Sequence, residues 1–136
     1  MNNFSKKYNF INPIIKYYSK LEYNIGPHAK LIFKELISSI KNENWATVII
    51  LSATFLDVLN HEIDGVKIEI DGLTLNSTFS SRSIYWLRTR RNSIVHHEGP
   101  TEGMMGGKFE MEELKLDAKK SVQILEKLIK GLINFE

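Results

Sequence analysis

Three side chains in the second half of the sequence, Arg91, Asn92 and His96, have the types and spacing needed to act together on a phosphate ester. Imidazole can accept or donate a proton near neutral pH, which the attack of an RNA 2′-hydroxyl on phosphorus requires. A guanidinium can stabilise the negative charge that develops on phosphorus, and an amide can orient either group. The trio therefore predicts phosphodiester cleavage, with Arg91, His96 and Asn92 as candidate catalytic residues.

The arginines of the sequence are confined to one ten-residue stretch: Arg82, Arg88, Arg90 and Arg91. The other 14 basic residues are lysines, and no acidic residue occurs between Asp71 and Glu98. Arginine binds phosphate through two parallel hydrogen bonds, a geometry that lysine lacks. The clustering favours a phosphate-binding surface. The alternative is a cationic helix face that is solvated or paired with acids from elsewhere.

A helix from about Ser83 to Glu98 would place these residues at defined angles, since each residue turns the helix by roughly 100°. Its expected buried stripe consists of four apolar residues: Ile84, Leu87, Ile94 and Val95. Arg91 falls in the middle of this stripe, where a charge requires a groove, a subunit interface or an acid from another helix. Asn92 and His96 are one turn apart on its flank, so we expect the trio to line one edge of the helix.

Length and composition predict a single folded domain over residues 1–136, with residues 1–12 poorly ordered. The chain is 43% hydrophobic and 25% charged, with a net charge of +2. It has no cysteine, which excludes disulfides, thiolate metal sites and cysteine nucleophiles. No carboxylate pair or histidine pair at ligand spacing demands a metal, so we expect no metal and no cofactor. We see no signal peptide and no apolar run approaching about 20 residues, and we expect a cytoplasmic protein without a membrane span.

Hydrophobic periodicity predicts an all-α fold, a four- to five-helix up-and-down bundle. Helices are expected from Asn12-Pro13, from Gly26-Pro27, over about Trp45–Ile63, from Ser80-Ser81 to about His97, and from about Glu110 onward. Alternating residues on both sides of Asp71-Gly72, over 66–75, predict a small β-hairpin insert. The last helix has an expected buried stripe of seven residues: Leu114, Ala118, Val122, Leu125, Leu128, Ile129 and Leu132.

The helix over about Trp45–Ile63 is apolar nearly all round, which is typical of the centre of a bundle. Its polar members, Ser52, Asp57 and Glu62, could occupy the one face that reaches water. We favour that interpretation for Glu62. The role of Asp57 stays open, because an acid on the central helix is the natural place to look for a partner of Arg91.

The segment Arg91-Asn92-Ser93-Ile94-Val95-His96 reads R-N-x-x-x-H and resembles the R-x4-6-H signature of the HEPN superfamily, in the form with a polar residue after the arginine. The surroundings are also similar: Trp86-Leu87 precedes the arginine by about one turn, and Leu116-Asp117-Ala118 opens a final amphipathic helix. The resemblance covers roughly residues 28–135, and the motif itself is six residues long.

The resemblance implies a homodimer in which two motif helices face each other across a two-fold axis and form an RNA-cleaving cleft. Arg91 and His96 would be the catalytic pair, assisted by Asn92, while Arg88 and Arg90 would hold the RNA backbone. Members of the family include toxins, phage-defence factors and partners of small nucleotidyltransferases, so an antitoxin or such an enzyme is an expected partner. Some toxin members have a modifiable tyrosine two residues after the histidine. This chain has Glu98 there, which puts that regulation in doubt.

Less specific interpretations remain. His96 could simply cap the C-terminal end of its helix, and Trp45 and Trp86 are better explained by packing than by base stacking. The chain could be a HEPN-like module that binds nucleotide or protein without catalysis, using the same residues. It could also be a helical adaptor or antitoxin subunit, for which Arg91 and His96 would have no specific role.

Overall fold

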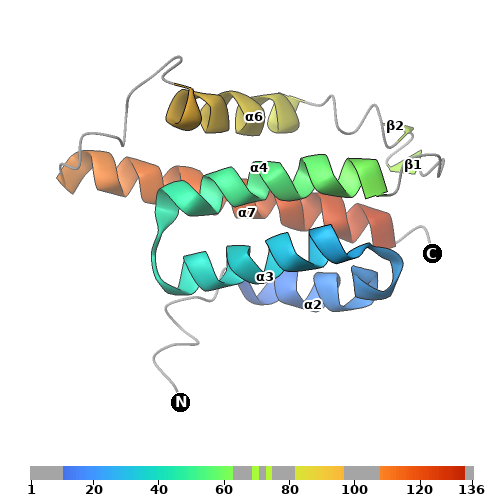
Figure 1. Ribbon diagram of the computed structural model, residues 1–136. Coiled ribbons are helices and arrows are strands. Elements are labelled where there is room, and N and C mark those ends of the chain that lie inside the picture. The colour runs from blue at the N-terminus through green and yellow to red at the C-terminus, as the bar shows by residue number, and fades with distance from the viewer. Residues whose placement is uncertain (1–10, 63–68, 71–72, 75–81, 97–107, 134–136) are drawn as a thin grey trace.

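The computed structural model describes residues 11–62, 69–70, 73–74, 82–96 and 108–133. Within these ranges the chain forms five α-helices: α2 (Asn12–Leu21), α3 (Pro27–Lys41), α4 (Trp45–Glu62), α6 (Arg82–Val95) and α7 (Lys108–Ile133). A short 3₁₀ turn, η2 (Glu22–Asn24), follows α2 directly. The predicted all-α class is confirmed, and successive helices run in opposite directions within a bundle (Figure 1).

Two strands of two residues each, β1 (Glu69–Ile70) and β2 (Leu73–Thr74), pair in antiparallel fashion between α4 and α6. Glu69 is opposite Thr74, and Ile70 is opposite Leu73. The rest of the hairpin predicted over 66–75, including its Asp71-Gly72 turn, lies outside the described residues. Because so short a pairing adds no sheet layer, the fold is that of a helical bundle.

Proline and a left-handed residue set the boundaries of the first three helices. Proline lies in the first turn of α2 and of α3, where its missing N–H has no helical partner to lose. At the end of α3, Glu43 has a positive φ of 57°. The N–H of Asn44 donates to the carbonyl of Ser39 at 2.9 Å, and that of Glu43 donates to Ile40 at 3.1 Å. These two bonds form a Schellman motif, which ends α3 and turns the chain into α4.

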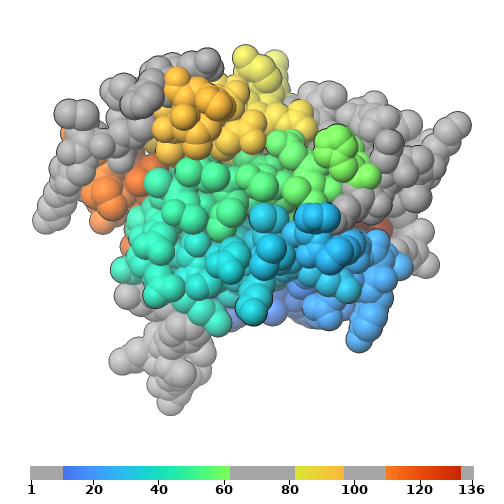
Figure 2. Space-filling model, in the orientation of Figure 1, coloured from blue at the N-terminus to red at the C-terminus, as the bar shows by residue number. Residues whose placement is uncertain are grey.

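Helix α4 lies at the centre of the bundle, as its sequence predicted. It packs against α3, α6 and α7, while α2 packs against α7 (Figure 1). The space-filling view shows α6 lying directly along α4 at the upper surface of the molecule (Figure 2). Because three helices cover α4, apolar side chains around most of its circumference are buried: Val48, Ile49, Ala53, Phe55, Leu56 and Leu59.

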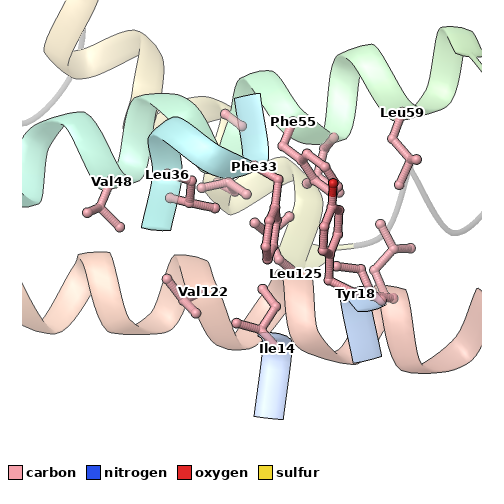
Figure 3. Packing of buried hydrophobic residues seen from close by; sticks show 14 of the residues in the cluster. Ile14, Tyr18, Phe33, Leu36, Val48, Phe55, Leu59, Val122 and Leu125 are labelled. Atoms are coloured by element: carbon pink, nitrogen blue, oxygen red, sulfur yellow. The ribbon is translucent and has the colours of Figure 1, made fainter. Parts of the chain in front are cut away.

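An aromatic cluster joins α2, α3 and α4 inside this core. The rings of Tyr18 and Phe33 stack with centroids 3.6 Å apart, and Phe55 meets Tyr18 edge-on at 6.5 Å (Figure 3). On the opposite side, α7 closes the core with the seven residues predicted for its stripe, all of which are buried. Burial of apolar surface on every helix is therefore the main stabilising contribution to the fold.

The expectation that residues 1–12 are poorly ordered was wrong for the last two of them, because Ile11 is 2% exposed and Asn12 begins α2. The core contacts of α2 are made by Ile14, Tyr18 and Leu21. Ser52, for which a position facing water was one interpretation, is fully buried, and its hydroxyl has no hydrogen-bond partner among the described residues. The order of residues 1–10 and the side chain of Glu62 lie outside the described residues. The motif helix α6 ends at Val95, two residues before the predicted end at about His97.

None of the helices in the described ranges is both long enough and apolar enough to cross a lipid bilayer.

Replacement of Leu125 by alanine tests the core. Leu125 is fully buried on α7, so Leu125→Ala should lower the free energy of unfolding by about 2–5 kcal/mol through lost burial and a cavity. Leu116 lies on the same helix but is 62% exposed, and Leu116→Ala should change that free energy by about 0.5 kcal/mol or less. Urea denaturation followed by circular dichroism measures both. Equal losses in the two variants would contradict the packing of α7.

Titration of Tyr18 provides a second test. Burial, followed by the nearby charge of Glu22, raises the pKa of Tyr18 above the ordinary value of 10.0. The folded protein therefore binds this proton more tightly than the unfolded chain does. The resulting stability is complete below pH 10 and is lost as the pH rises through the raised pKa. Above pH 10 the unfolding free energy of the wild type should fall more steeply than that of Tyr18→Phe, as measured by denaturation at several pH values. Parallel slopes would contradict the burial.

Candidate active site

Helix α6 contacts both α4 and α7, and its buried residues follow every third position: Ile84, Leu87, Arg90 and Ser93. The sequence prediction placed Arg91 in the buried stripe, and this was wrong by one residue. Ile94 is only half-buried and Val95 is exposed. A row of every third residue winds slowly around a helix, so it faces one neighbour at its start and another at its end. Arg90 rather than Arg91 consequently points into the bundle.

Asp57 on α4 pairs with two arginines of α6 at once. Its Oδ1 accepts hydrogen bonds from Arg88 Nε at 3.2 Å and from Arg88 Nη2 at 3.0 Å. Its Oδ2 accepts one from Arg91 Nη1 at 3.3 Å. The side chains of Asp57, Arg88 and Arg91 are 35%, 37% and 23% exposed, so the cluster lies at the edge of the bundle. The partner left open for Arg91 is thus identified, and Arg88 shares it.

The side chain of Arg91 also contacts Asn92, the next residue of the proposed trio. Arg91 Nε donates to Asn92 Oδ1 at 3.0 Å. One turn later, the backbone N–H of His96 donates to the carbonyl of Asn92 at 2.9 Å, which continues the helical hydrogen bonding to the histidine. His96 is exposed, and its ring makes no hydrogen bond within the described ranges. The structure therefore joins Arg91 to Asn92 and places His96 one turn beyond them, open to solvent.

Arg90 occupies a different environment from the other arginines. It is only 7% exposed, and its Nε donates to Asp117 Oδ2 on α7 at 2.9 Å. Its Nη1 also donates to Ser93 Oγ at 3.1 Å. A buried guanidinium is stable only when it is paired in this way. Arg90 thus connects α6 to α7 inside the protein, and we leave it out of the proposed RNA-binding set.

Trp86 takes part in packing, as its sequence context suggested. It is half-buried on α6, and the Nζ of Lys120 on α7 lies 4.0 Å from the centre of its ring. A lysine ammonium over an indole face is a stabilising cation–π contact. Trp45 is buried at the start of α4, and Lys115 lies over its ring at 5.9 Å. Sequence reasoning missed Asp117 and Lys120. The row of every third residue from Ile84 includes Arg90. This row would have predicted that Arg90 is buried and requires an acidic partner.

Within the described ranges, no group of three or more histidine, aspartate or glutamate side chains is arranged to hold a metal ion. The functional groups of the cluster are two guanidiniums, one carboxylate, one amide and, one turn away, one imidazole. Such a set can bind an anion and can transfer a proton.

Comparison of the chain with protein-family models, with curated proteins and with solved structures gave no match.

Loss of the carboxylate beside Arg90 should destabilise the fold. Asp117→Ala removes the acceptor 2.9 Å from a buried guanidinium, and we expect a loss of about 1–3 kcal/mol in unfolding free energy. Glu126 is a half-buried acid on the same helix without an ion pair among the described residues, so Glu126→Ala should change stability by about 0.5 kcal/mol or less. Thermal and urea denaturation measure both. Equal losses of unfolding free energy in the two variants would show that the Arg90–Asp117 ion pair does not specifically stabilise the fold.

Proposed function

We propose that this chain is an endoribonuclease of HEPN type, in which Arg91, Asn92 and His96 cleave RNA without a metal ion. One observation supports the proposal above the others. The guanidinium of Arg91 is held by Asp57 and Asn92 at the surface of α6, one helical turn from an exposed imidazole. A guanidinium of fixed orientation in the last turns of α6 and, five residues later, an exposed imidazole that can transfer a proton are the groups that this reaction needs.

In the proposed reaction the imidazole of His96 accepts the proton of an RNA 2′-hydroxyl. The 2′-oxygen then attacks the adjacent phosphorus, and the bond from phosphorus to the 5′-oxygen breaks. The products are a 2′,3′-cyclic phosphate and a 5′-hydroxyl, which takes up a proton as it leaves. Arg91 stabilises the negative charge on the phosphoryl oxygens at the transition state, and Arg88 binds the neighbouring backbone phosphate.

A homodimer would supply the second proton-transfer group. The outward ridge of α6 contains Tyr85, Thr89, Asn92 and His96, which share one face at helical spacing. Tyr85 is 72% exposed on this ridge, and an exposed aromatic residue is typical of an interface. Two copies related by a two-fold axis would bring their ridges together, so that His96 of one subunit accepts the proton and His96 of the other donates one.

The second candidate is a HEPN-like module that binds nucleotide or protein without catalysis. It is favoured by the imidazole of His96, which makes no hydrogen bond among the described residues, whereas a catalytic base is commonly oriented by a partner group. Under either function we place the protein in the cytoplasm, with RNA and an antitoxin or nucleotidyltransferase as partners. A role as a toxin or in phage defence belongs to the same proposal.

RNA cleavage in EDTA tests the nuclease directly. Purified protein is incubated with a pool of tRNA and single-stranded RNA, and the products are separated on denaturing gels. Arg91→Ala and His96→Ala should each lower the cleavage rate by about 100-fold or more, because each removes a group that acts at the transition state. Lys30→Ala and His61→Ala serve as matched controls, since both residues are exposed and lie outside the trio and the arginine stretch. They should cleave at the wild-type rate.

Analytical ultracentrifugation of the same samples shows whether wild type and variants form the same dimer. Intact RNA with all proteins, at concentrations where the dimer forms, would leave the binding module as the better function. Equal cleavage by wild type and His96→Ala would remove His96 from the mechanism.

A further inference from the structure

Asp57 pairs with both Arg88 and Arg91 at the edge of the bundle, and it restricts the orientation of the Arg91 side chain in particular. A guanidinium is planar, so two hydrogen bonds to different nitrogens fix the orientation of its plane. Arg91 has both, from Nη1 to Asp57 and from Nε to Asn92. Its third nitrogen, Nη2, makes no hydrogen bond within the described part of the chain. The direction of that free donor is therefore set by Asp57 and Asn92 together.

The same carboxylate also lowers the charge of the cluster. Arg88 and Arg91 contribute two positive charges, and Asp57 cancels one of them. All three side chains are partly exposed, so an incoming phosphate meets a site with one excess positive charge rather than two. Since each oxygen of Asp57 binds a different arginine, the carboxylate also occupies donors that a phosphate could use.

We propose that Asp57 is a positioning residue with opposite effects on the two steps of the reaction: it weakens the binding of the RNA backbone and speeds its cleavage. It weakens binding because it neutralises charge and competes for donors. It speeds cleavage because it holds the Arg91 guanidinium, which stabilises the transition state in the proposed reaction, in one orientation. The proposed effect of Asp57 on cleavage rests on the proposed nuclease function. The proposed effects on RNA binding and on the orientation of Arg91 rest on the ion pairs alone.

Asp57→Asn separates the two effects, because it removes the charge and leaves a neutral amide of nearly the same size. Binding is measured by fluorescence polarisation with a labelled 2′-O-methyl RNA oligonucleotide, which cannot be cleaved because its nucleophile is blocked. Asp57→Asn should bind this probe roughly 3- to 10-fold more tightly at moderate salt. Single-turnover cleavage at saturating unmodified RNA should be slower by about 10- to 100-fold, because Arg91 is no longer held in position.

Glu35→Gln is the matched control. Glu35 is an exposed acid on α3, and its substitution makes the same change in net charge. It should leave the cleavage rate unchanged and alter binding by less than twofold. A purely structural role for Asp57 would instead lower binding and cleavage together, and would overturn the proposal. Cleavage by Asp57→Asn at or above the wild-type rate would also overturn it, since Asp57 would then be only a competitor.

A third measurement distinguishes failure of this inference from failure of the nuclease function. The chain has only four arginines, so its arginine Nε–Hε NMR signals can be assigned by single substitutions. The Arg91 signal should exchange with solvent more rapidly in Asp57→Asn than in the wild type. If the wild type cleaves no RNA, the nuclease function fails, and so does the proposed effect of Asp57 on cleavage. Tighter probe binding and faster exchange in Asp57→Asn would still support the proposed effects of Asp57 on RNA binding and on the orientation of Arg91. Unchanged probe binding and unchanged Arg91 exchange in Asp57→Asn would overturn the proposed role of Asp57, whether or not the wild type cleaves RNA.

Discussion

The packing of α6 against the bundle depends on carboxylates of other helices that pair with its arginines. Only two large apolar side chains of this helix, Ile84 and Leu87, are buried, and its neighbour in the buried row is Arg90. A guanidinium taken out of water destabilises a fold by several kcal/mol unless an acid meets it. Asp117 on α7 meets Arg90, and Asp57 on α4 meets Arg88 and Arg91. Two acids on two helices thereby hold the helix that contains the motif.

These ion pairs divide the arginines into two groups. Arg90 is enclosed with Asp117 and Ser93 and contributes to structure. Arg88 and Arg91 share one carboxylate at the rim and keep part of their surface in water. The rim pair retains one net positive charge beside Asn92 and one turn from His96. The fold and the proposed chemistry thus use arginines that are adjacent in sequence but 100° apart around the helix.

Most of the architecture could be predicted because its signals are local. Pro13 and Gly26-Pro27 mark helix starts through backbone geometry, and both starts were confirmed. The periodicity of the last helix predicted seven apolar residues that are all buried, since an amphipathic helix has one apolar face whatever it packs against. The all-round apolar character of α4 likewise predicted a central position. The one-turn spacing of Asn92 and His96 also follows from helix geometry alone.

The sequence by itself determined the helices, the apolar core faces of α4 and α7 and the residue types available for chemistry. The tertiary structure alone decided which arginine is buried and which acids meet the others. An apolar stripe read from α6 pointed to Arg91, whereas the contact of α6 with both α4 and α7 buries Arg90. Asp57 and Asp117 are 31 and 27 residues from the arginines they bind at shortest range, so no local pattern links them. Their pairing arises only when three helices pack together and the charges at their contacts must be matched.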